Sequence, residues 1–347
     1  MNAMPIIRMI AALAWLGLQT PTTAFAQTAP PVEFFRGKTI NILVGSEAGG
    51  GYDLYARFLA QFLGQQIPGQ PTVIVQNMPG AGGLRASRNL ASAAPKDGTT
   101  LGMLAQNLTF DTVLGYSPDI DTSAFNWIGR VAMNAEVGVA RAQSGVTSIE
   151  TARNREIPTG GSGGTSSSTV VPFLLNRLAG TRFKLIAGYK SANEALLAME
   201  RGEIEMVGAT GISTIMAKHA AWLRDGTVKL IYQTALTRHP VVPEVPTIGE
   251  LGTGSEEKQI LGLFAVGAEI GRALIAPPGV PAERVAVLRR AMAATLAAPE
   301  TRSYATRHSL ALEVGSGDEL SAIVRKMLAT PEPVVAKARG ILESLKR

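Results

Sequence analysis

The sequence of 347 residues contains no cysteine and only three histidines. Without cysteine the protein has no disulfide bond, no thiol nucleophile and no zinc site built on thiolates. The histidines, His219, His239 and His308, show neither H-x-H nor H-x-x-x-H spacing, the usual pattern of a histidine metal site. We therefore expect no bound metal ion.

Charged residues are also scarce, at 17% of the chain, and the 33 lysines and arginines are dispersed instead of forming a block with aromatic residues between them. The formal net charge of +6 therefore gives no support for nucleic-acid binding. Nucleotide signatures are missing as well. No G-x-x-x-x-G-K-[ST] occurs, and Leu54 and Arg85 stand where two glycine-rich loops would need the last glycine of G-x-G-x-x-G. We expect neither a nucleic-acid partner nor a cofactor.

Long apolar runs are absent too, because no stretch reaches the roughly 20 residues that a membrane-spanning helix needs. The run at 9–18 follows Arg8 and precedes Ala24-Phe25-Ala26, which has the small-x-small form of a signal-peptidase site. A membrane anchor is the alternative interpretation, but the run is short for one. We expect residues 1–26 to be a signal peptide that is cleaved after Ala26, which would give a periplasmic protein.

Glycine, by contrast, is abundant, with 37 residues. The loop at 45–53 lies between a predicted strand at 39–44 and a predicted amphipathic helix at 52–63. Its glycines let the backbone approach a ligand closely, and the helix start presents unpaired N–H groups at the same point. This combination indicates an anion site.

The order of strand, glycine-rich turn and helix recurs along the chain. Further strands are predicted at 71–76, 99–105, 204–207 and 228–234, and glycine-rich loops at 77–83, 160–168 and 208–211. The prolines between 240 and 246 predict a loop, and the C-terminal part reads as helices, one of them opened by a capping box at Ser316 and Glu319. The pattern predicts an α/β fold with mainly parallel sheets and helices on both faces, and glycine loops gathered where ligands bind.

Residues 160–164 also satisfy G-x-S-x-G, the nucleophile motif of α/β hydrolases. A serine hydrolase would use Ser162, with His308 as the base and Asp225 as the third member of a triad. The match is weak, because the segment is rich in glycine and serine and residues 154–159 make a poor buried strand. A secreted α/β serine hydrolase therefore stays an alternative.

Asp53, in the first turn of the helix predicted at 52–63, has two interpretations. In one, it complements the positive end of the helix dipole. In the other, it lines the anion site and accepts a hydrogen bond from a ligand hydroxyl or amine, or from water, because it would repel a ligand carboxylate directly. In the second case we expect Asp53→Ala to weaken ligand binding at least about tenfold.

Six segments that occur in this order resemble the substrate-binding proteins of tripartite tricarboxylate transporters, the Bug or TctC family. They are 49–57 (GGGYDLYAR), 77–83 (NMPGAGG), 94–101 (APKDGTTL), 189–190 (YK), 242–247 (VPEVPT) and 276–281 (APPGVP). The resemblance covers about residues 36–330. It implies the two-lobed type II periplasmic-binding-protein fold, with lobe 1 at 36–138 plus 270–347, lobe 2 at 139–269, and an organic acid in the cleft between them.

The resemblance also implies that the glycine and serine loops bind the ligand, partly through ordered water. The implied ligand-binding residues are Gly49, Gly50, Gly51, Tyr52, Asp53, Gly80, Ala81, Gly82, Gly83, Ser162, Thr165, Ser166, Ser167, Tyr189 and Thr210. The chain departs from the family's pattern at Gly164, Thr169, Ala209-Thr210 and Gly271-Arg-Ala-Leu, where the family usually has a proline, a histidine, an aspartate and an aromatic residue.

We therefore expect a monomeric solute-binding protein, not an enzyme. It would capture a small carboxylate ligand and deliver it through transient contact with inner-membrane transporter subunits. Its lobes would close about hinges near 137–141 and 265–275. An extracytoplasmic sensor partner with the same fold is an alternative that the sequence does not separate from transport.

Overall fold

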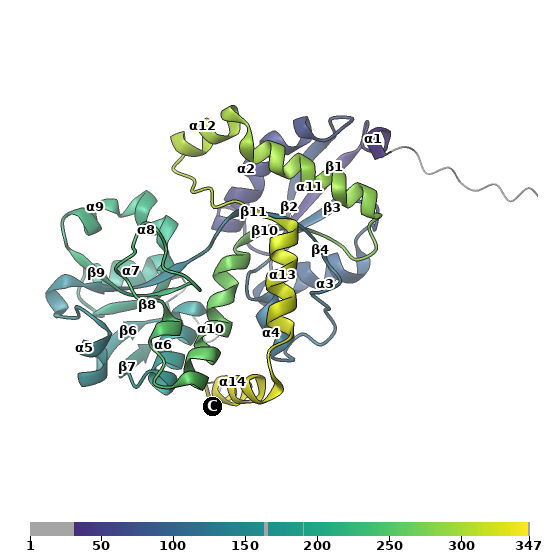
Figure 1. Ribbon diagram of the computed structural model, residues 1–347. Coiled ribbons are helices and arrows are strands. Elements are labelled where there is room, and N and C mark those ends of the chain that lie inside the picture. Colours follow the sequence, from purple (N-terminus) through teal and green to yellow (C-terminus); the bar gives the residue numbers. More distant parts are fainter. Residues whose placement is uncertain (1–30, 163–165, 190, 346–347) are drawn as a thin grey trace, which may run out of the picture.

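The computed structural model describes residues 31–162, 166–189 and 191–345, so the expected signal peptide at 1–26 lies outside the described residues. The strands form two separate sheets, one on each side of the molecule (Figure 1). The first sheet has the strand order β11-β4-β10-β3-β1-β2, and the second has β7-β6-β8-β5-β9. Each sheet carries helices, which confirms the α/β fold class predicted from the sequence.

The first sheet and its helices form what we call the first unit. Its strands are β1 (Thr39–Val44), β2 (Thr72–Asn77), β3 (Thr100–Met103), β4 (Asn126–Ala132), β10 (Arg272–Ala276) and β11 (Gly315–Ser316). Its helices are α1 (Pro31–Phe34), α2 (Gly51–Gln66), α3 (Leu84–Arg88), α4 (Leu108–Val113), α11 (Ala282–Ala297), α12 (Pro299–Arg307) and α13 (Gly317–Leu328). A 3₁₀ turn, η1 (Ala81–Gly83), precedes α3, and a π turn, η2 (Asn89–Ala93), continues it.

The second sheet and its helices form the second unit. Its strands are β5 (Glu136–Arg141), β6 (Ile157–Gly160), β7 (Phe183–Ile186), β8 (Met206–Gly211) and β9 (Val228–Thr234). Its helical segments are η3 (Ala142–Ser144), α5 (Ile149–Asn154), α6 (Ser167–Leu178), α7 (Ala192–Glu200), α8 (Ile212–Lys218), α9 (Ala220–Arg224) and η4 (Ile248–Glu250). The long helix α10 (Ser255–Ile270) then leads the chain back to the first sheet, and α14 (Glu332–Leu345) ends it.

Both sheets are mixed, which corrects the prediction of mainly parallel sheets. β1 pairs in parallel with β2 and β3, and β6 pairs in parallel with β7 and β8. By contrast, β10 runs antiparallel to β3 and β4, and β5 runs antiparallel to β8 and β9. β5 and β10 are the strands by which the chain enters one sheet from the other, since residues 133–135 lead from β4 to β5 and α10 leads back to β10.

The two segments that cross between the units pack against each other. Gly271, which ends α10 with a φ of 54°, lies so close to the carbonyl oxygen of Ala132 that a side chain would collide with it. The N–H of Asn134 donates to the carbonyl of Ala268 at 3.1 Å. The sheets therefore change at 133–135, whereas the predicted lobe boundary at 138 and the predicted hinge at 137–141 fall inside β5.

The C-terminal helices connect the units along one side of the molecule. α13 begins with the predicted capping box, in which Glu319 N donates to Ser316 Oγ at 3.1 Å and Ser316 N to Glu319 Oε2 at 3.4 Å. α14 then packs against α6 and α10 at the lower edge of Figure 1, where Val334 and Leu342 join the same apolar cluster as Leu174. We propose that α14 moves with the second unit, although the sequence placed it in lobe 1.

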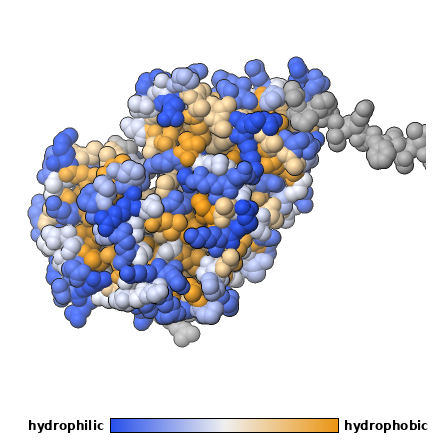
Figure 2. Space-filling model, viewed as in Figure 1, coloured by the Kyte–Doolittle hydropathy of each residue, from blue (hydrophilic) through white to orange (hydrophobic). Residues whose placement is uncertain are grey.

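The visible surface mixes polar and apolar side chains over both units (Figure 2). Among the residues that the structure describes, no helix has the length and apolar character that a membrane span requires.

Gly208 in β8 provides a test of how α6 is seated. A side chain at this position would collide with the carbonyl of Ser168 in the first turn of α6. We expect Gly208→Ala to lower the free energy of unfolding by about 1–3 kcal/mol, as overpacking does. Urea denaturation would measure the change. Gly340→Ala in α14 is the control, because nothing lies within 4 Å of the added methyl group and alanine favours a helix interior. A Gly208→Ala protein as stable as the Gly340→Ala protein would contradict this packing.

Candidate functional site

Two glycine loops at the carboxyl ends of β1 and β2 lie in direct contact. A Cβ atom on Gly45 would lie only 3.1 Å from Gly83 Cα, so the loops approach as closely as glycine allows. Residues 80–83 all have positive φ angles, and one of them, Ala81 at 48°, is not a glycine. The structure thus brings together the two glycine-rich loops predicted at 45–53 and 77–83.

Asp53 fixes the shape of the first loop. Its side chain is only 3% exposed, and its Oδ2 accepts hydrogen bonds from Gly49 N at 2.8 Å and Arg57 Nε at 2.9 Å. Its Oδ1 accepts from Asn77 Nδ2 at 2.9 Å. Burial alone would raise the pKa of Asp53, but the hydrogen bonds from Arg57, Gly49 and Asn77 outweigh it and hold the pKa below its usual range. Both carboxylate oxygens are therefore engaged by donors of the chain itself, and we interpret Asp53 as a positioning residue. Direct ligand contact by Asp53 stays a prediction.

The start of α2 presents unpaired polar groups. The first backbone hydrogen bond of this helix is donated by Leu54 N to Gly50 O at 2.9 Å, so the N–H groups of residues 51–53 have no acceptor among the described residues. Nearby, Gly50 lies beside Ser46, and Tyr52 Oη accepts a hydrogen bond from Gln106 N at 2.9 Å. Three buried side-chain atoms in this region lack a hydrogen-bond partner in the described part of the chain: Ser46 Oγ, Gln106 Oε1 and Arg272 Nε. Such groups favour a polar ligand.

Tyr52 keeps its proton in this environment. Burial raises the pKa of Tyr52 to about 12, although Arg272 and the Gln106 N–H act in the opposite direction and Glu136 adds to the rise. Because its oxygen already accepts from Gln106, the hydroxyl proton is available to an acceptor on a ligand.

The serine-rich loop of the second unit is organised by Ser168, which the sequence did not single out. Ser168 is 2% exposed, and its Oγ accepts from Ser162 N at 2.9 Å and lies 3.0 Å from Ser162 Oγ and 2.9 Å from Ser166 Oγ. Ser167 Oγ donates to Glu136 Oε1 at 2.8 Å. Three of the predicted serines therefore meet at the start of α6. The fourth residue predicted here, Thr165, lies outside the described residues.

The remaining two predicted site residues also lie in the second unit, Tyr189 in the loop after β7 and Thr210 within β8. Tyr189 is partly buried beside Gly160, where a Cβ atom would lie 3.1 Å from Tyr189 Cε2. Thr210 is 3% exposed and pairs with Val137 within the sheet. Residues 208–211 were predicted as a glycine-rich loop, but they belong to β8, where Gly208 packs closely against α6.

Glu136 and Arg272 place opposite charges at the junction of the two units, and the sequence identified neither. Glu136 begins β5, and Arg272 begins β10. Burial raises the pKa of Glu136, while the hydrogen bond from Ser167 and the charge of Arg272 lower it. The only signal in the sequence was indirect, since Arg272 belongs to the stretch that departs from the family's pattern.

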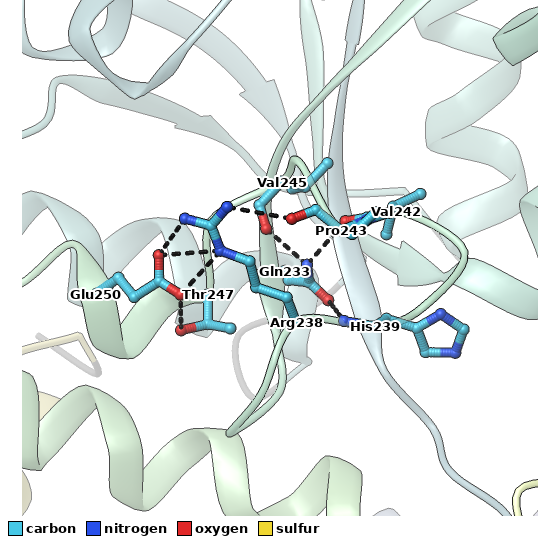
Figure 3. Close-up of polar contacts among 8 residues, drawn as sticks. All are labelled: Gln233, Arg238, His239, Val242, Pro243, Val245, Thr247 and Glu250. Carbon is cyan, nitrogen blue, oxygen red and sulfur yellow. Dashed lines mark hydrogen bonds and ion pairs between the residues drawn. The ribbon is translucent and has the colours of Figure 1, made fainter.

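The proline-rich loop after β9 contacts the first unit through His239. The buried side chain of Gln233 holds the loop, because its Nε2 donates to Val245 O at 2.6 Å and its Oε1 accepts from His239 N at 2.8 Å (Figure 3). The His239 ring points away from this network, and its Nε2 lies 2.9 Å from Glu313 Oε1 in the first unit. This contact links the two units.

The structure does not assemble the hydrolase triad. Ser162 hydrogen-bonds with Ser168, whereas the His308 ring stacks on Tyr304 at 4.1 Å and Asp225 pairs with Arg224 at 3.0 Å. His219 stacks on Trp222. Within the described ranges no histidine hydrogen-bonds to Ser162, and no group of three histidine, aspartate or glutamate side chains could hold a metal ion.

A comparison with models of protein families gives the family of this chain. The model of the tripartite tricarboxylate transporter family receptor matches residues 55–340. The protein belongs to this receptor family. The family predicted from the sequence is therefore confirmed, and solved members are periplasmic binding proteins.

Known relatives of this receptor cover most of its length. The curated "UPF0065 protein in gbd 5′ region" of Cupriavidus necator is 30% identical over 268 residues, which are 73% of this chain and 77% of the relative. A TctC solute-binding protein from Polaromonas has the same fold, with a TM-score of 0.66 at 21% identity over 88% of this chain and 98% of that one. MatC from Rhodopseudomonas palustris, solved with bound malate, is 26% identical, with a TM-score of 0.59 over 86% of this chain and 99% of that one.

Asp53→Asn tests whether the carboxylate stabilises the first loop. We expect the variant to lose about 1–3 kcal/mol of unfolding free energy at neutral pH, because buried donors lose a charged acceptor. The pKa of Asp53 is lowered in the folded protein, so its carboxylate adds to the free energy of unfolding above about pH 3.9, the ordinary pKa of aspartate. This stabilisation is lost as the pH falls through the folded pKa. Urea denaturation of the wild type and of Asp53→Asn at several pH values would show that their difference in unfolding free energy becomes smaller at acidic pH. Asp119→Asn, which breaks the exposed pair with Arg88, is the control. A difference between wild type and Asp53→Asn that is independent of pH would contradict this role.

Proposed function

We propose that this receptor binds a small organic carboxylate between its two units and delivers it unchanged to the membrane subunits of a tripartite transporter. The observation that carries the proposal is the start of α2, where N–H groups and three buried polar side-chain atoms lack hydrogen-bond partners among the described residues. A helix start of this kind attracts an anion. The missing nucleotide signatures argue against a nucleotide phosphate, and the malate found in MatC supports a carboxylate.

The two helix starts offer a reason for closure. The start of α2 belongs to the first unit, and the start of α6, with its serine hydroxyls, belongs to the second. A ligand that contacts both starts interacts fully with the protein only when the units are close, so it favours the closed arrangement. We propose that the crossings at 133–135 and Gly271 provide the hinge.

Three finer features of the proposal follow from the sequence and the site. The signal peptide would be removed after Ala26 on export to the periplasm. The receptor would work as a monomer that contacts its transporter transiently. It would leave the ligand chemically unchanged, which is consistent with the hydrogen bonding of Ser162 to another serine instead of to a base.

A thermal-shift series tests the proposed function. We expect at least one of acetate, succinate, malate, citrate and benzoate to raise the melting temperature, because a ligand at a hundred times its Kd stabilises the native state by about 2.7 kcal/mol. Succinamide, the uncharged analogue of succinate, is the matched control and should have no effect. If succinamide raised the melting temperature and no acid did, the carboxylate proposal would be wrong.

A further inference from the structure

Arg272 is a buried arginine whose hydrogen-bonding capacity is largely unused. Its side chain is 6% exposed, and its Nη1 donates to Met133 O at 3.1 Å. Its Nε is buried without a partner, and no carboxylate forms an ion pair with it in the described part of the chain. The guanidinium lies 4.6 Å from the centre of the Tyr55 ring and 6.0 Å from that of Tyr52. Such aromatic contacts offset only part of the cost of burying a charge.

Arg130 shows what a satisfied arginine looks like in the same sheet. It is 5% exposed, but its Nε donates to Glu313 O at 2.8 Å, its Nη1 donates to Glu269 O, and its Nη2 lies 3.7 Å from a carboxylate oxygen of Glu319. Every nitrogen of Arg130 thus has a role in holding β4 to its neighbours. In the described part of the chain Arg272 lacks such a set of acceptors, so its side chain has hydrogen-bonding capacity left for a ligand.

The Arg272 side chain points at the start of α2. A Cβ atom on Gly51 would lie 3.0 Å from Arg272 Nη2, which places the guanidinium beside the first residue of the helix. The free N–H groups of residues 51–53 converge on the same region. Asp53 does not pair with Arg272, because its oxygens accept from Gly49, Arg57 and Asn77, and its ion-pair partner is Arg57. A full positive charge and the positive end of a helix dipole therefore act on one place.

Glu136 faces this place from the second unit. Its Oε1 is held by the Ser167 hydroxyl at 2.8 Å, and its Oε2 has no hydrogen bond among the described residues. The charge of Glu136 adds to the rise in the pKa of Tyr52, and the charge of Arg272 lowers the pKa of Glu136, although Glu136 and Arg272 do not form an ion pair. The arrangement offers a cationic site and, opposite it, a hydrogen-bond acceptor.

Resting on the proposed carboxylate-binding function, we propose that Arg272 and the start of α2 together bind one carboxylate of the ligand, and that Glu136 accepts a hydrogen bond from a hydroxyl or ammonium group of the same ligand. The ligand class is then an organic acid that also carries such a donor. A second carboxylate directed at Glu136 would be repelled. Arg272 is the residue that confers charge recognition on a site otherwise built from backbone groups and hydroxyls.

Calorimetric titration of the full chain with succinate, malate, aspartate and citrate tests the role of Arg272. We expect Arg272→Gln to weaken the binding of every acid that the wild type binds by at least about thirtyfold, since one partner of a desolvated charge pair is lost. Arg272→Lys keeps the charge but not the planar fork, so it should bind with intermediate affinity. Arg88→Gln removes an exposed positive charge in the same unit and should bind like the wild type.

Melting temperatures without added acid separate a ligand role from a structural one. Arg272→Gln should melt at or above the wild-type temperature, because removing a buried charge without an ion-pair partner offsets the loss of one hydrogen bond to Met133 O and of the contacts with the tyrosine rings. Arg130→Gln should melt clearly lower, because its nitrogens donate to main-chain carbonyls. A Tm loss in Arg272→Gln as large as in Arg130→Gln would overturn the inference, as would unchanged acid binding. If none of the four acids bound to the wild type, the ligand class inferred here would be wrong, whereas the proposed carboxylate-binding function would fail only if acetate and benzoate also left the melting temperature unchanged.

Paired ligands test Glu136. Malate and aspartate differ from succinate by one hydroxyl and one ammonium group, and we expect the wild type to bind at least one of them more tightly than succinate. Glu136→Gln should make the affinities for succinate and for the preferred acid more similar. The substitution removes the charged acceptor for the hydroxyl or ammonium group, and it also removes the repulsion between Glu136 and a carboxylate of succinate. Binding of succinate as tightly as malate and aspartate to the wild type would overturn the role of Glu136 while leaving that of Arg272 intact.

Discussion

The contact between the two chain crossings is the constraint on which the rest of the structure depends. Gly271 fits against residues 132–134 only because it has no side chain and adopts a positive φ. That contact fixes where α10 ends, and the next residue, Arg272, is thereby directed toward the start of α2. The other crossing ends at Glu136, which begins the second sheet. A single packing requirement thus places a positive and a negative side chain from the two units at their junction.

The loops around this junction are held by hydrogen bonds within the protein. In the first unit, Asp53 ties Gly49, Arg57 and Asn77 together, and in the second unit Ser168 gathers the hydroxyls of Ser162 and Ser166. At the start of α2, the N–H groups of residues 51–53 have no acceptor in the part of the chain that the structure describes. A ligand that meets groups already fixed in place loses less free energy to ordering, which is how such a site gains affinity from modest contacts.

The sequence predicted the parts of the site whose signals are local. Glycines in the segments 49–51 and 80–83 mark loops after strands, and the capping box at Ser316 marks a helix start, because each depends on neighbouring residues only. Features set by distant contacts were missed. β6 has four residues with a proline among them, Gly208 lies in a strand and not in the predicted loop, and Arg272 and Glu136 lie at one junction only because the two crossings touch. No spacing along the chain records such a meeting.

The most direct test of the central claim is a crystal structure of the receptor with the acid that raises its melting temperature most. The account predicts a carboxylate of that acid within hydrogen-bonding distance of the N–H groups at the start of α2 and of Arg272, with the start of α6 on its other side. An acid bound elsewhere, with the start of α2 in contact only with solvent or with the protein itself, would contradict the account.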